Sequence, residues 1–324
     1  MNTPLLSAKD LTVQFRTPKG PITAVDGIDL TLERGEVLGI IGESGSGKSV
    51  TMRALLRILP EAKTEIAGDL KLDGKDVLSL KGHDLAAYRG GDVSMVFQEP
   101  ATALDPVFTI GTQISETVRR HRKVSRKDAQ ARALEMLELV RIPSPASRLG
   151  NYPHEMSGGM RQRAMIALTL AAGPKLLLAD EPTTALDATV QIQVILLLRE
   201  LQREMGMATI FVTHDVGVAA EISDRIAVMY AGRIVETGTA AEVLKNPKHP
   251  YTQGLLSSTV QGAVPGTPIK AIPGMPPDLA QMPPGCAFAP RCPLATSACQ
   301  AAVPDLRAQG GERRVACVRL EEIA

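Results

Sequence analysis

The chain has 324 residues, of which 44% are hydrophobic and 22% charged, a composition typical of a globular protein that buries a core. At about 150 residues per domain, this length favours two structural units. The 36 basic residues nearly balance the 35 acidic ones, so bulk charge favours neither nucleic acid nor an acidic membrane surface as a partner. No stretch approaches a membrane-spanning length of uncharged apolar residues, and the N-terminus has no apolar signal-peptide core. We therefore expect a cytosolic chain, or one bound to a membrane only through partners.

The first part of the chain has the pattern of antiparallel strands. Apolar and polar residues alternate over Leu5–Phe15 and Ile28–Leu32, which predicts a half-exposed sheet. Phe15 stands out because only 3% of the residues are aromatic. Two interpretations stay open for it: an aromatic platform on which an adenine ring stacks, or a strand residue that fills the core.

A glycine-rich stretch follows a short apolar run, Val37–Ile41, and precedes a predicted helix, Val50–Leu59. It fits the phosphate-binding pattern G-x-x-x-x-G-K-[ST] and consists of Gly42, Glu43, Ser44, Gly45, Ser46, Gly47, Lys48 and Ser49. Glycines let successive backbone N–H groups converge on phosphate oxygens, and the helix N-terminus adds partial positive charge. Lys48 is expected to reach the β- and γ-phosphates, and the Ser49 hydroxyl to ligate Mg²⁺. The sequence therefore predicts a P-loop that binds a nucleoside triphosphate.

Polar residues stand where three further predicted strands end. Gln98, the pair Asp180 and Glu181, and His214 follow apolar runs over residues 93–97, 176–179 and 208–212. Ligands of α/β proteins bind at the carboxyl ends of the strands. The acidic pair supplies a Mg²⁺ ligand and a candidate base, although a surface acidic pair is the alternative. For His214 we favour a functional role over a structural one because of its place at a strand end.

The pattern between residues 100 and 172 is helical, which predicts an insertion into the α/β core. Arg126–Val140 is amphipathic. Ser157, Gly158 and Gly159 lie in this block, where a serine N-cap and two glycines allow a phosphate to approach a helix start. A long helix is predicted over Ala188–Met205, and a hairpin over residues 226–237 completes the domain.

In this order, the motifs resemble those of ABC-type ATPases over about residues 5 to 245. The resemblance implies that Gln98 couples the Mg²⁺ site to the helical subdomain, that Glu181 polarises the attacking water and that His214 holds the γ-phosphate. It also implies that Ser157, Gly158 and Gly159 act on the ATP of a second subunit in a head-to-tail dimer. Asp187, within Ala185-Leu186-Asp187, would then lie at the dimer interface. The chain departs from the common Leu-Ser-Gly-Gly-Gln signature, with Met156 and Met160 at its two ends.

A narrower resemblance is to the ATPase subunits of dipeptide and oligopeptide importers. It is carried by Tyr152–Glu155 before the Ser-Gly-Gly run and by Asn246–Leu256 after the cassette. It implies two integral-membrane permease subunits, a second ATPase subunit that is a paralogue or a copy, and an extracellular solute-binding protein. Thr109–Ile114 resembles the part that would face the permeases. Nickel and glutathione importers share much of this pattern and stay open as alternatives.

Four cysteines lie in the proline-rich tail. Twelve of the 23 prolines follow residue 245, which argues against more regular core there. The tail contains Cys286, Cys292, Cys299 and Cys317, spaced C-x₅-C-x₆-C-x₁₇-C. Disulfides are not expected in a reducing compartment, so four thiolates around one metal centre are the better interpretation. The wide spacing favours a [4Fe–4S] cluster, with zinc or unliganded thiols as alternatives.

We therefore expect an ABC ATPase domain over 1–245, with a helical subdomain at about 100–172, and an importer C-terminal extension over 246–324. The fold class is α/β, a P-loop NTPase with an antiparallel β subdomain. The expected function is Mg²⁺-dependent ATP hydrolysis that drives peptide import, at the cytoplasmic face of the cell membrane and without a role for nucleic acid. Two alternatives remain: a soluble ABC ATPase acting in nucleic-acid or translation processes, and a redox-sensing iron–sulfur protein.

Overall fold

The computed structural model describes residues 3–98, 103–183, 187–258 and 271–322. Its contacts divide the chain into two compact units. The first comprises Met1–Glu33, Val37–Leu78 and Phe211–Ala324, and the second comprises Arg34–Glu36 and Ser79–Ile210. Pro100 and Ala185-Leu186 lie outside the described residues, so the structure does not bear on the predictions for them.

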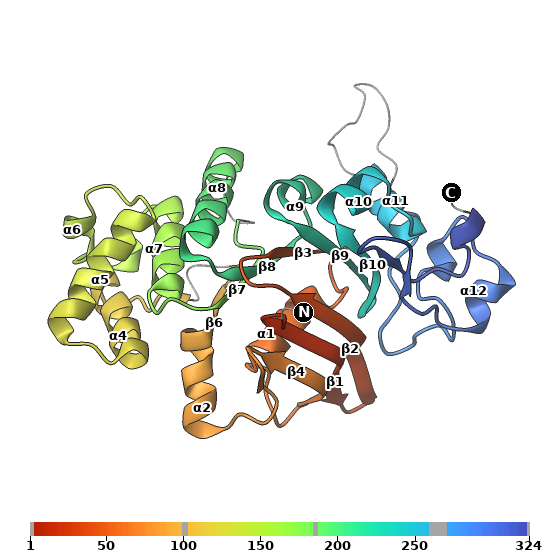
Figure 1. The fold of residues 1–324 in the computed structure, drawn as a ribbon, viewed down its shortest axis with the longest axis horizontal. Helices are drawn as coiled ribbons and strands as arrows, with labels where there is room; N and C mark the ends of the chain where they lie inside the picture. Colours follow the sequence, from red (N-terminus) through yellow and green to blue (C-terminus); the bar gives the residue numbers. More distant parts are fainter. Residues whose placement is uncertain (1–2, 99–102, 184–186, 259–270, 323–324) are drawn as a thin grey trace. The chain divides into compact units, whose positions relative to one another are not determined.

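The first unit contains an antiparallel sheet with strand order β2-β1-β4-β5 (Figure 1). Its strands are β1 (Leu6–Thr17), β2 (Gly20–Leu32), β4 (Thr64–Leu72) and β5 (Lys75–Asp76). In β1 the side chains of Leu6, Ala8, Leu11 and Val13 are buried, with a register shift after Ala8 that keeps the apolar face inward. The antiparallel sheet predicted from the alternation is therefore confirmed, and β2 begins eight residues earlier than predicted.

A second sheet in this unit carries the phosphate loop. The strands that lie wholly within this unit run in the order β11-β12-β10-β9-β3. They are β3 (Val37–Ile41), β9 (Arg225–Tyr230), β10 (Arg233–Thr239), β11 (Arg307–Ala308) and β12 (Arg314–Val315). All five residues of β3 are buried, and β3 pairs with β9 in parallel. The predicted hairpin is confirmed, since β9 and β10 are antiparallel and the turn residues Ala231 and Gly232 both have positive φ.

The helices of this unit include one directly after the phosphate loop. They are α1 (Lys48–Leu55), α9 (Val216–Ile222), α10 (Ala240–Lys245), α11 (Pro250–Ser257) and α12 (Ser297–Ala301). The prediction that the first helix continues to Leu59 is wrong, because it ends at Leu55 and Arg57 then turns the chain with a φ of 57°.

The tail forms more regular structure than its prolines predict. Val315 and Arg314 of β12 pair with Glu236 and Thr237 of β10, so the tail extends the sheet. Phe288 shares a hydrophobic cluster with Ile41 of β3 and with other buried residues of the cassette. The tail and the phosphate-loop strand therefore help to build the same core.

The second unit is mainly helical. It contains α2 (Gly82–Ala87), α4 (Ile110–Arg122), α5 (Arg126–Leu139), α6 (Pro145–Arg148), α7 (Gly158–Leu170) and α8 (Ala188–Met205). The parallel strands β6 (Val93–Val96) and β7 (Leu176–Asp180) accompany them, and β8 (Ala208–Thr213) begins in this unit and ends in the first. None of the helices in the described part of the chain is long and apolar enough to cross a membrane.

Candidate functional site

The phosphate loop is shaped by glycines that no other residue could replace without a clash. Gly42 has a φ of 153°, and a Cβ there would lie 2.2 Å from the carbonyl oxygen of Met229. Gly47, with a φ of 103°, is the N-cap of α1, and its Cβ would lie 2.6 Å from the carbonyl oxygen of Ala24. At both positions the loop passes close to the backbone of another segment of the same chain. Only glycine, which has no Cβ, permits this approach.

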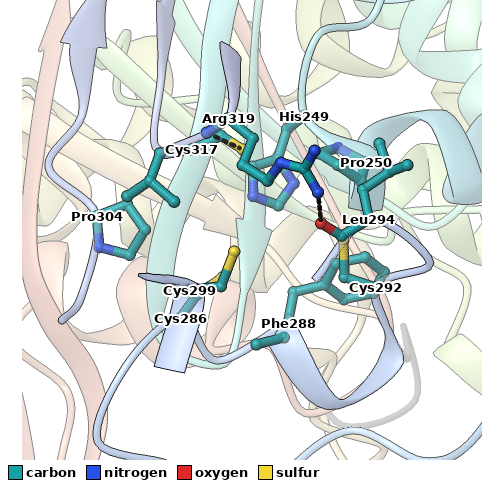
Figure 2. A pocket seen from close by; sticks show the side chains of 12 residues that line it. His249, Pro250, Cys286, Phe288, Cys292, Leu294, Cys299, Pro304, Cys317 and Arg319 are labelled. Atoms are coloured by element: carbon teal, nitrogen blue, oxygen red, sulfur yellow. Dashed lines mark hydrogen bonds between the residues drawn. The ribbon is translucent and has the colours of Figure 1, made fainter. Parts of the chain in front are cut away.

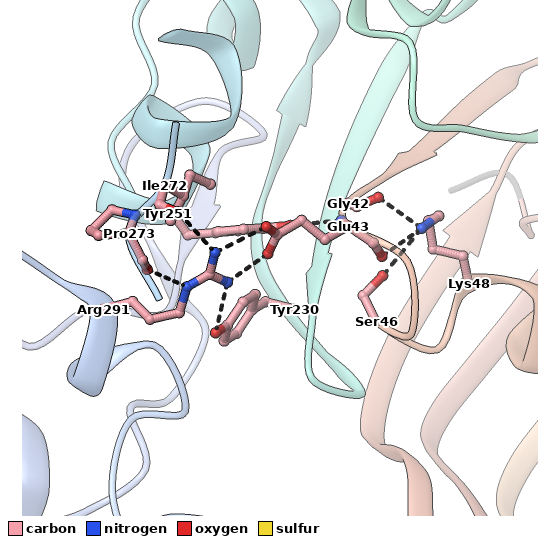
Figure 3. Close-up of polar contacts among 9 residues, drawn as sticks. All are labelled: Gly42, Glu43, Ser46, Lys48, Tyr230, Tyr251, Ile272, Pro273 and Arg291. Carbon is pink, nitrogen blue, oxygen red and sulfur yellow. Dashed lines mark hydrogen bonds and ion pairs between the residues drawn. The ribbon is translucent and has the colours of Figure 1, made fainter. Parts of the chain in front are cut away.

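Lys48 places a cation inside this loop. The side chain is 5% exposed, and its ammonium donates hydrogen bonds to the carbonyl oxygens of Gly42 (2.7 Å) and Glu43 (2.8 Å). It also lies 3.4 Å from the Ser46 hydroxyl (Figure 3). Ser49 follows in the first turn of α1. A buried ammonium beside a helix N-terminus is suited to hold anionic oxygens such as those of a phosphate.

Two other predicted residues lie in the same unit as the phosphate loop. Phe15 lies in β1 and is half-buried, so its ring keeps an accessible surface. His214 is exposed and directly follows β8. Its neighbour Asp215 caps α9 by accepting bonds from the N–H groups of Gly217 (2.8 Å) and Val218 (3.2 Å). The cap fixes the backbone at the position where His214 leaves the strand.

The second unit brings Gln98 and Asp180, two of the three predicted Mg²⁺ ligands beside Ser49 of the first unit, to one sheet edge. β6 and β7 pair in parallel with Val96 opposite Ala179, so their carboxyl ends meet. Asp180 ends β7 and is only 5% exposed. Glu181 follows with a φ of 46°, and Gln98 follows β6 with an exposed side chain. A positive φ at a non-glycine residue is strained and common at functional sites.

The Ser-Gly-Gly motif forms a capped helix start, as predicted. The Ser157 hydroxyl accepts a bond from the Met160 N–H (3.3 Å) at the start of α7, and Ser157 and Gly158 are exposed. Met156 is 4% exposed, so the methionine at the first signature position packs in the core. Asp187 caps α8 in the same way through the Val190 N–H (3.0 Å).

Sequence reasoning missed three residues that touch these sites. The Gln162 amide, 1% exposed, donates to the carbonyl oxygen of Pro182, directly after Glu181. The Tyr251 hydroxyl accepts the Glu43 N–H (2.8 Å), and the Arg291 guanidinium binds the Glu43 carboxylate. Gln162 lies three residues after Gly159, in the run Ser-Gly-Gly-Met-Arg-Gln-Arg, so its nearness to the signature was a usable signal. No local pattern links Tyr251 or Arg291 to a loop more than 200 residues earlier.

All four cysteines line one small pocket in the tail, together with His249 and Phe288 (Figure 2). None of the four forms a disulfide. Burial raises the pKa of the Cys286, Cys292 and Cys317 thiols, and the neighbouring Cys299 raises it further. The Thr296 and Arg319 N–H groups donate to the sulfurs of Cys299 (3.5 Å) and Cys317 (3.4 Å).

No three His, Cys, Asp or Glu side chains in the described residues are arranged to hold a metal ion. The structure therefore does not show the predicted metal centre, although the four cysteines do lie around one pocket.

A buried strand, a glycine loop closed by a buried lysine, and a separate Ser-Gly-Gly helix start define the class of this protein. It is a P-loop ATPase of the ATP-binding cassette type.

Comparison with known proteins agrees with this class. The model of the ABC transporter family matches residues 25–184, and that of the oligopeptide/dipeptide transporter C-terminal region matches residues 235–299. The oligopeptide transport ATP-binding protein of Bacillus subtilis is 49% identical over 89% of this chain and 81% of its own length. The dipeptide transport ATP-binding protein of the same organism is 44% identical over 97% of this chain and 94% of its own length.

A solved structure shares the fold. A dimeric ATP-binding cassette bound to ADP and phosphate after hydrolysis is 28% identical with a TM-score of 0.64, over 72% of this chain and 98% of that one. This chain belongs to the ATP-binding proteins of the ABC transporter family.

Proposed function

We propose that this chain is the ATP-hydrolysing subunit of an importer for dipeptides or oligopeptides. The observation that carries the proposal is that one chain matches both the ABC transporter family and the C-terminal region of oligopeptide/dipeptide transporters. Relatives named as oligopeptide and dipeptide transport proteins align over most of this chain. The domains would then be the ABC ATPase over 1–245 and the extension over 246–324.

The residues present fit ATP and Mg²⁺. The loop over residues 42–49 would hold the phosphates, with Lys48 on the β- and γ-phosphates, and Phe15 would support the adenine. Mg²⁺ would be held by Ser49, Gln98 and Asp180, all of which offer oxygen ligands, and it would neutralise phosphate charge. Fit is supported by the buried ammonium of Lys48 and by the glycine cradle around it.

Hydrolysis would depend on two residues beyond the phosphate loop. Glu181 would orient and polarise the attacking water, and His214 would hold the γ-phosphate. Such phosphoryl transfer needs positioning and charge stabilisation more than covalent chemistry.

A second ATPase subunit would complete each site. Ser157, Gly158 and Gly159 would act on the ATP of that subunit, and Asp187 would lie at the interface. The exposed, capped start of α7 supports this role, because free N–H groups at a helix start attract anions. Closure and reopening of the dimer would move two integral-membrane permeases, which Thr109–Ile114 would face. The chain would then lie on the cytoplasmic face of the membrane, with an extracellular binding protein supplying the solute.

Replacement of Glu181 by glutamine tests the ATPase assignment. In the complex, we expect Glu181→Gln to lower the hydrolysis rate by at least about 100-fold while ATP binding persists, because the amide cannot act as a base. Glu200→Gln is the matched control, since Glu200 lies in the same unit and pairs with Arg141. Undiminished hydrolysis in Glu181→Gln would contradict the assignment, and stimulation of hydrolysis by nucleic acid without permeases would favour the soluble alternative.

For the tail we propose a [4Fe–4S] cluster held by Cys286, Cys292, Cys299 and Cys317, with zinc as the alternative. Because no three of these side chains are arranged to hold a metal ion in the described structure, binding would require the thiols to rearrange. Support comes from the shared pocket and from the N–H donors to two of the sulfurs, because hydrogen bonds to cluster sulfurs help to set the reduction potential of such clusters. When bound, such a cluster would supply a cross-link that folds the tail, and its redox state would offer a point of control.

Anaerobic purification with visible absorption and metal analysis tests this proposal. Broad brown absorption with about four irons per chain is the expected result. One zinc per chain and no visible colour would show that the cysteines hold a structural zinc ion and no iron–sulfur cluster. Absence of any metal would overturn both forms of the proposal.

A further inference from the structure

An arginine of the tail holds the phosphate loop. Arg291 binds Glu43 through two parallel bonds, from Nη1 to Oε2 (2.7 Å) and from Nη2 to Oε1 (3.0 Å) (Figure 3). The Arg291 side chain is 4% exposed and that of Glu43 is 28% exposed. Bidentate pairs of this kind fix both partners in position as well as stabilising their charges.

The tail fixes Arg291 from the other side. Its Nε donates to the carbonyl oxygen of Pro273 (2.9 Å), and its Nη1 lies 3.3 Å from the Tyr230 hydroxyl. The guanidinium also lies 5.9 Å from the ring centres of both Tyr230 and Phe288, within cation–π range. The buried Arg291 guanidinium is therefore held by several partners on more than one side.

Glu43 connects this arginine to Lys48. The Glu43 N–H is bound by the Tyr251 hydroxyl, and the Glu43 carbonyl oxygen accepts from the Lys48 ammonium. The side chain and both main-chain polar groups of Glu43 are therefore held at once. Glu43 thus connects Arg291, through its carboxylate, to Lys48, through its carbonyl oxygen.

The other end of this connection is the cysteine pocket. Arg291 is followed in the chain by Cys292, one of the four cysteines that line the pocket, and Phe288 lines it too. Ala289–Arg291 forms a short helical turn in which the Cys292 N–H donates to the Ala289 carbonyl oxygen (3.3 Å). Arg291 and Cys292 are thus adjacent residues at the end of one hydrogen-bonded turn, so a change in the position of the Cys292 sulfur would act directly beside Arg291.

We propose that Arg291 is a positioning residue of the nucleotide site. Through Glu43 it sets the shape of the phosphate loop and makes nucleotide affinity depend on the state of the four-cysteine pocket. This inference rests on the proposed ATP site, and it assigns to the tail a regulatory connection to that site. It is an energetic coupling between two distinct positions, so it is measurable as a change in affinity.

Charge gives the expected direction of the effect. With Arg291 in place, the Glu43 carboxylate is neutralised beside the loop that receives anionic phosphates. Without Arg291, an uncompensated negative charge stays in the loop and repels ATP. Glu43→Gln removes that charge and keeps one acceptor oxygen for Arg291, so it loses one of the two bonds and adds no negative charge to the loop, and it should weaken binding less.

The test measures the dissociation constant of a fluorescent ATP analogue for the full chain, purified anaerobically. We expect Arg291→Gln to weaken binding roughly tenfold and Glu43→Gln about threefold. Arg291→Lys, which keeps the charge but not the fork, should fall between wild type and Arg291→Gln. Arg307→Gln is the matched control and should bind as wild type, because Arg307 lies on the exposed surface of the same tail and pairs with Asp305.

A double-mutant cycle tests the transmission itself. Cys292→Ser should weaken binding in the wild-type background and add nothing in the Arg291→Gln or Glu43→Gln background, because coupled residues are not additive. Unfolding midpoints of all variants show whether a loss of affinity is only a loss of folded protein. If Arg291→Gln does not fold, the double-mutant cycle of Cys292→Ser with Glu43→Gln tests the coupling instead, because Glu43 is only partly buried.

Two results would overturn the inference. The first is an affinity equal to that of wild type in folded Arg291→Gln or folded Glu43→Gln. The second is a loss of affinity from Cys292→Ser that is as large in the Arg291→Gln or Glu43→Gln background as in wild type. A different result would show that the proposed ATP site itself is wrong. In that case wild type would not bind the analogue, or Lys48→Ala would bind it as tightly as wild type.

Discussion

At the scale of the residue, local spacing made the phosphate loop predictable. Gly42, Gly47 and Lys48 are recognised by their positions in one short motif, and the structure gives each a steric or electrostatic reason. The bonds of Arg291 to Glu43 were not predictable, because 248 residues separate the partners and the phosphate-loop motif that contains Glu43 leaves this position unspecified. Single arginines are commonly surface residues, and only the fold shows that this one is buried.

Protonation of His249 should make stability depend on pH. This residue is 2% exposed, its Nδ1 accepts the Tyr251 N–H (3.1 Å), and burial lowers its pKa to about 4. An unfolded histidine has a pKa of about 6.5, so the unfolded state binds more protons between these values. The free energy of unfolding should therefore fall as pH falls from about 6.5 to about 4, by up to about 3 kcal/mol, and stay unaffected by this group above that window.

His249→Asn provides the comparison for this effect. Asparagine keeps an acceptor at the N-cap of α11 but does not titrate. Urea unfolding at about pH 7.5 and about pH 5 should show a larger loss in wild type than in the variant. Equal losses in the two proteins would mean that His249 does not carry the pH dependence.

At the scale of the element, the best predictions were those with an apolar run and clear ends. β3 and α8 have the predicted bounds, because β3 is an unbroken buried run and α8 starts at the Asp187 cap and ends at Gly206 in the left-handed conformation. α1 was predicted too long, since apolar residues continue past the turn at Arg57. β11 and β12 were missed because two-residue strands have no periodicity, and their pairing with β10 is set by tertiary contacts.

The two proposed roles of Asp187 can be separated by substitution. Asp187→Ala removes the cap of α8 and should lower the free energy of unfolding by about 1 kcal/mol, whereas Asp187→Asn keeps an acceptor and should not. Both should lower ATP hydrolysis by the complex if the carboxylate acts at the subunit interface.

Ser125→Ala is the control for a cap without that second role. Ser125 caps α5 through the Asp128 N–H (3.2 Å), so its loss should cost a similar free energy of unfolding and leave hydrolysis unchanged. Full hydrolysis in Asp187→Asn would remove the interface role and leave Asp187 as a cap.

At the scale of the whole molecule, the sequence predicted the class of protein but not how the tail is built into it. The rings of Tyr230, Tyr251 and Phe288 meet with centroids 4.5 to 5.4 Å apart, joining β9, α11 and the tail in one core. Such aromatic pairs add to the stability that burial already provides. The tail is therefore part of the unit that holds the phosphate loop, which is why its chemistry is relevant to the ATPase.

The central claim is that ATP hydrolysis by this chain drives peptide import. The most direct measurement is ATP-dependent uptake of a labelled dipeptide by vesicles that contain the complete complex, with wild type or Glu181→Gln as this subunit. We predict uptake with wild type, none with Glu181→Gln, and competition by unlabelled peptides but not by nickel or glutathione. Uptake that persists in Glu181→Gln, or that only nickel or glutathione suppresses, would contradict the account.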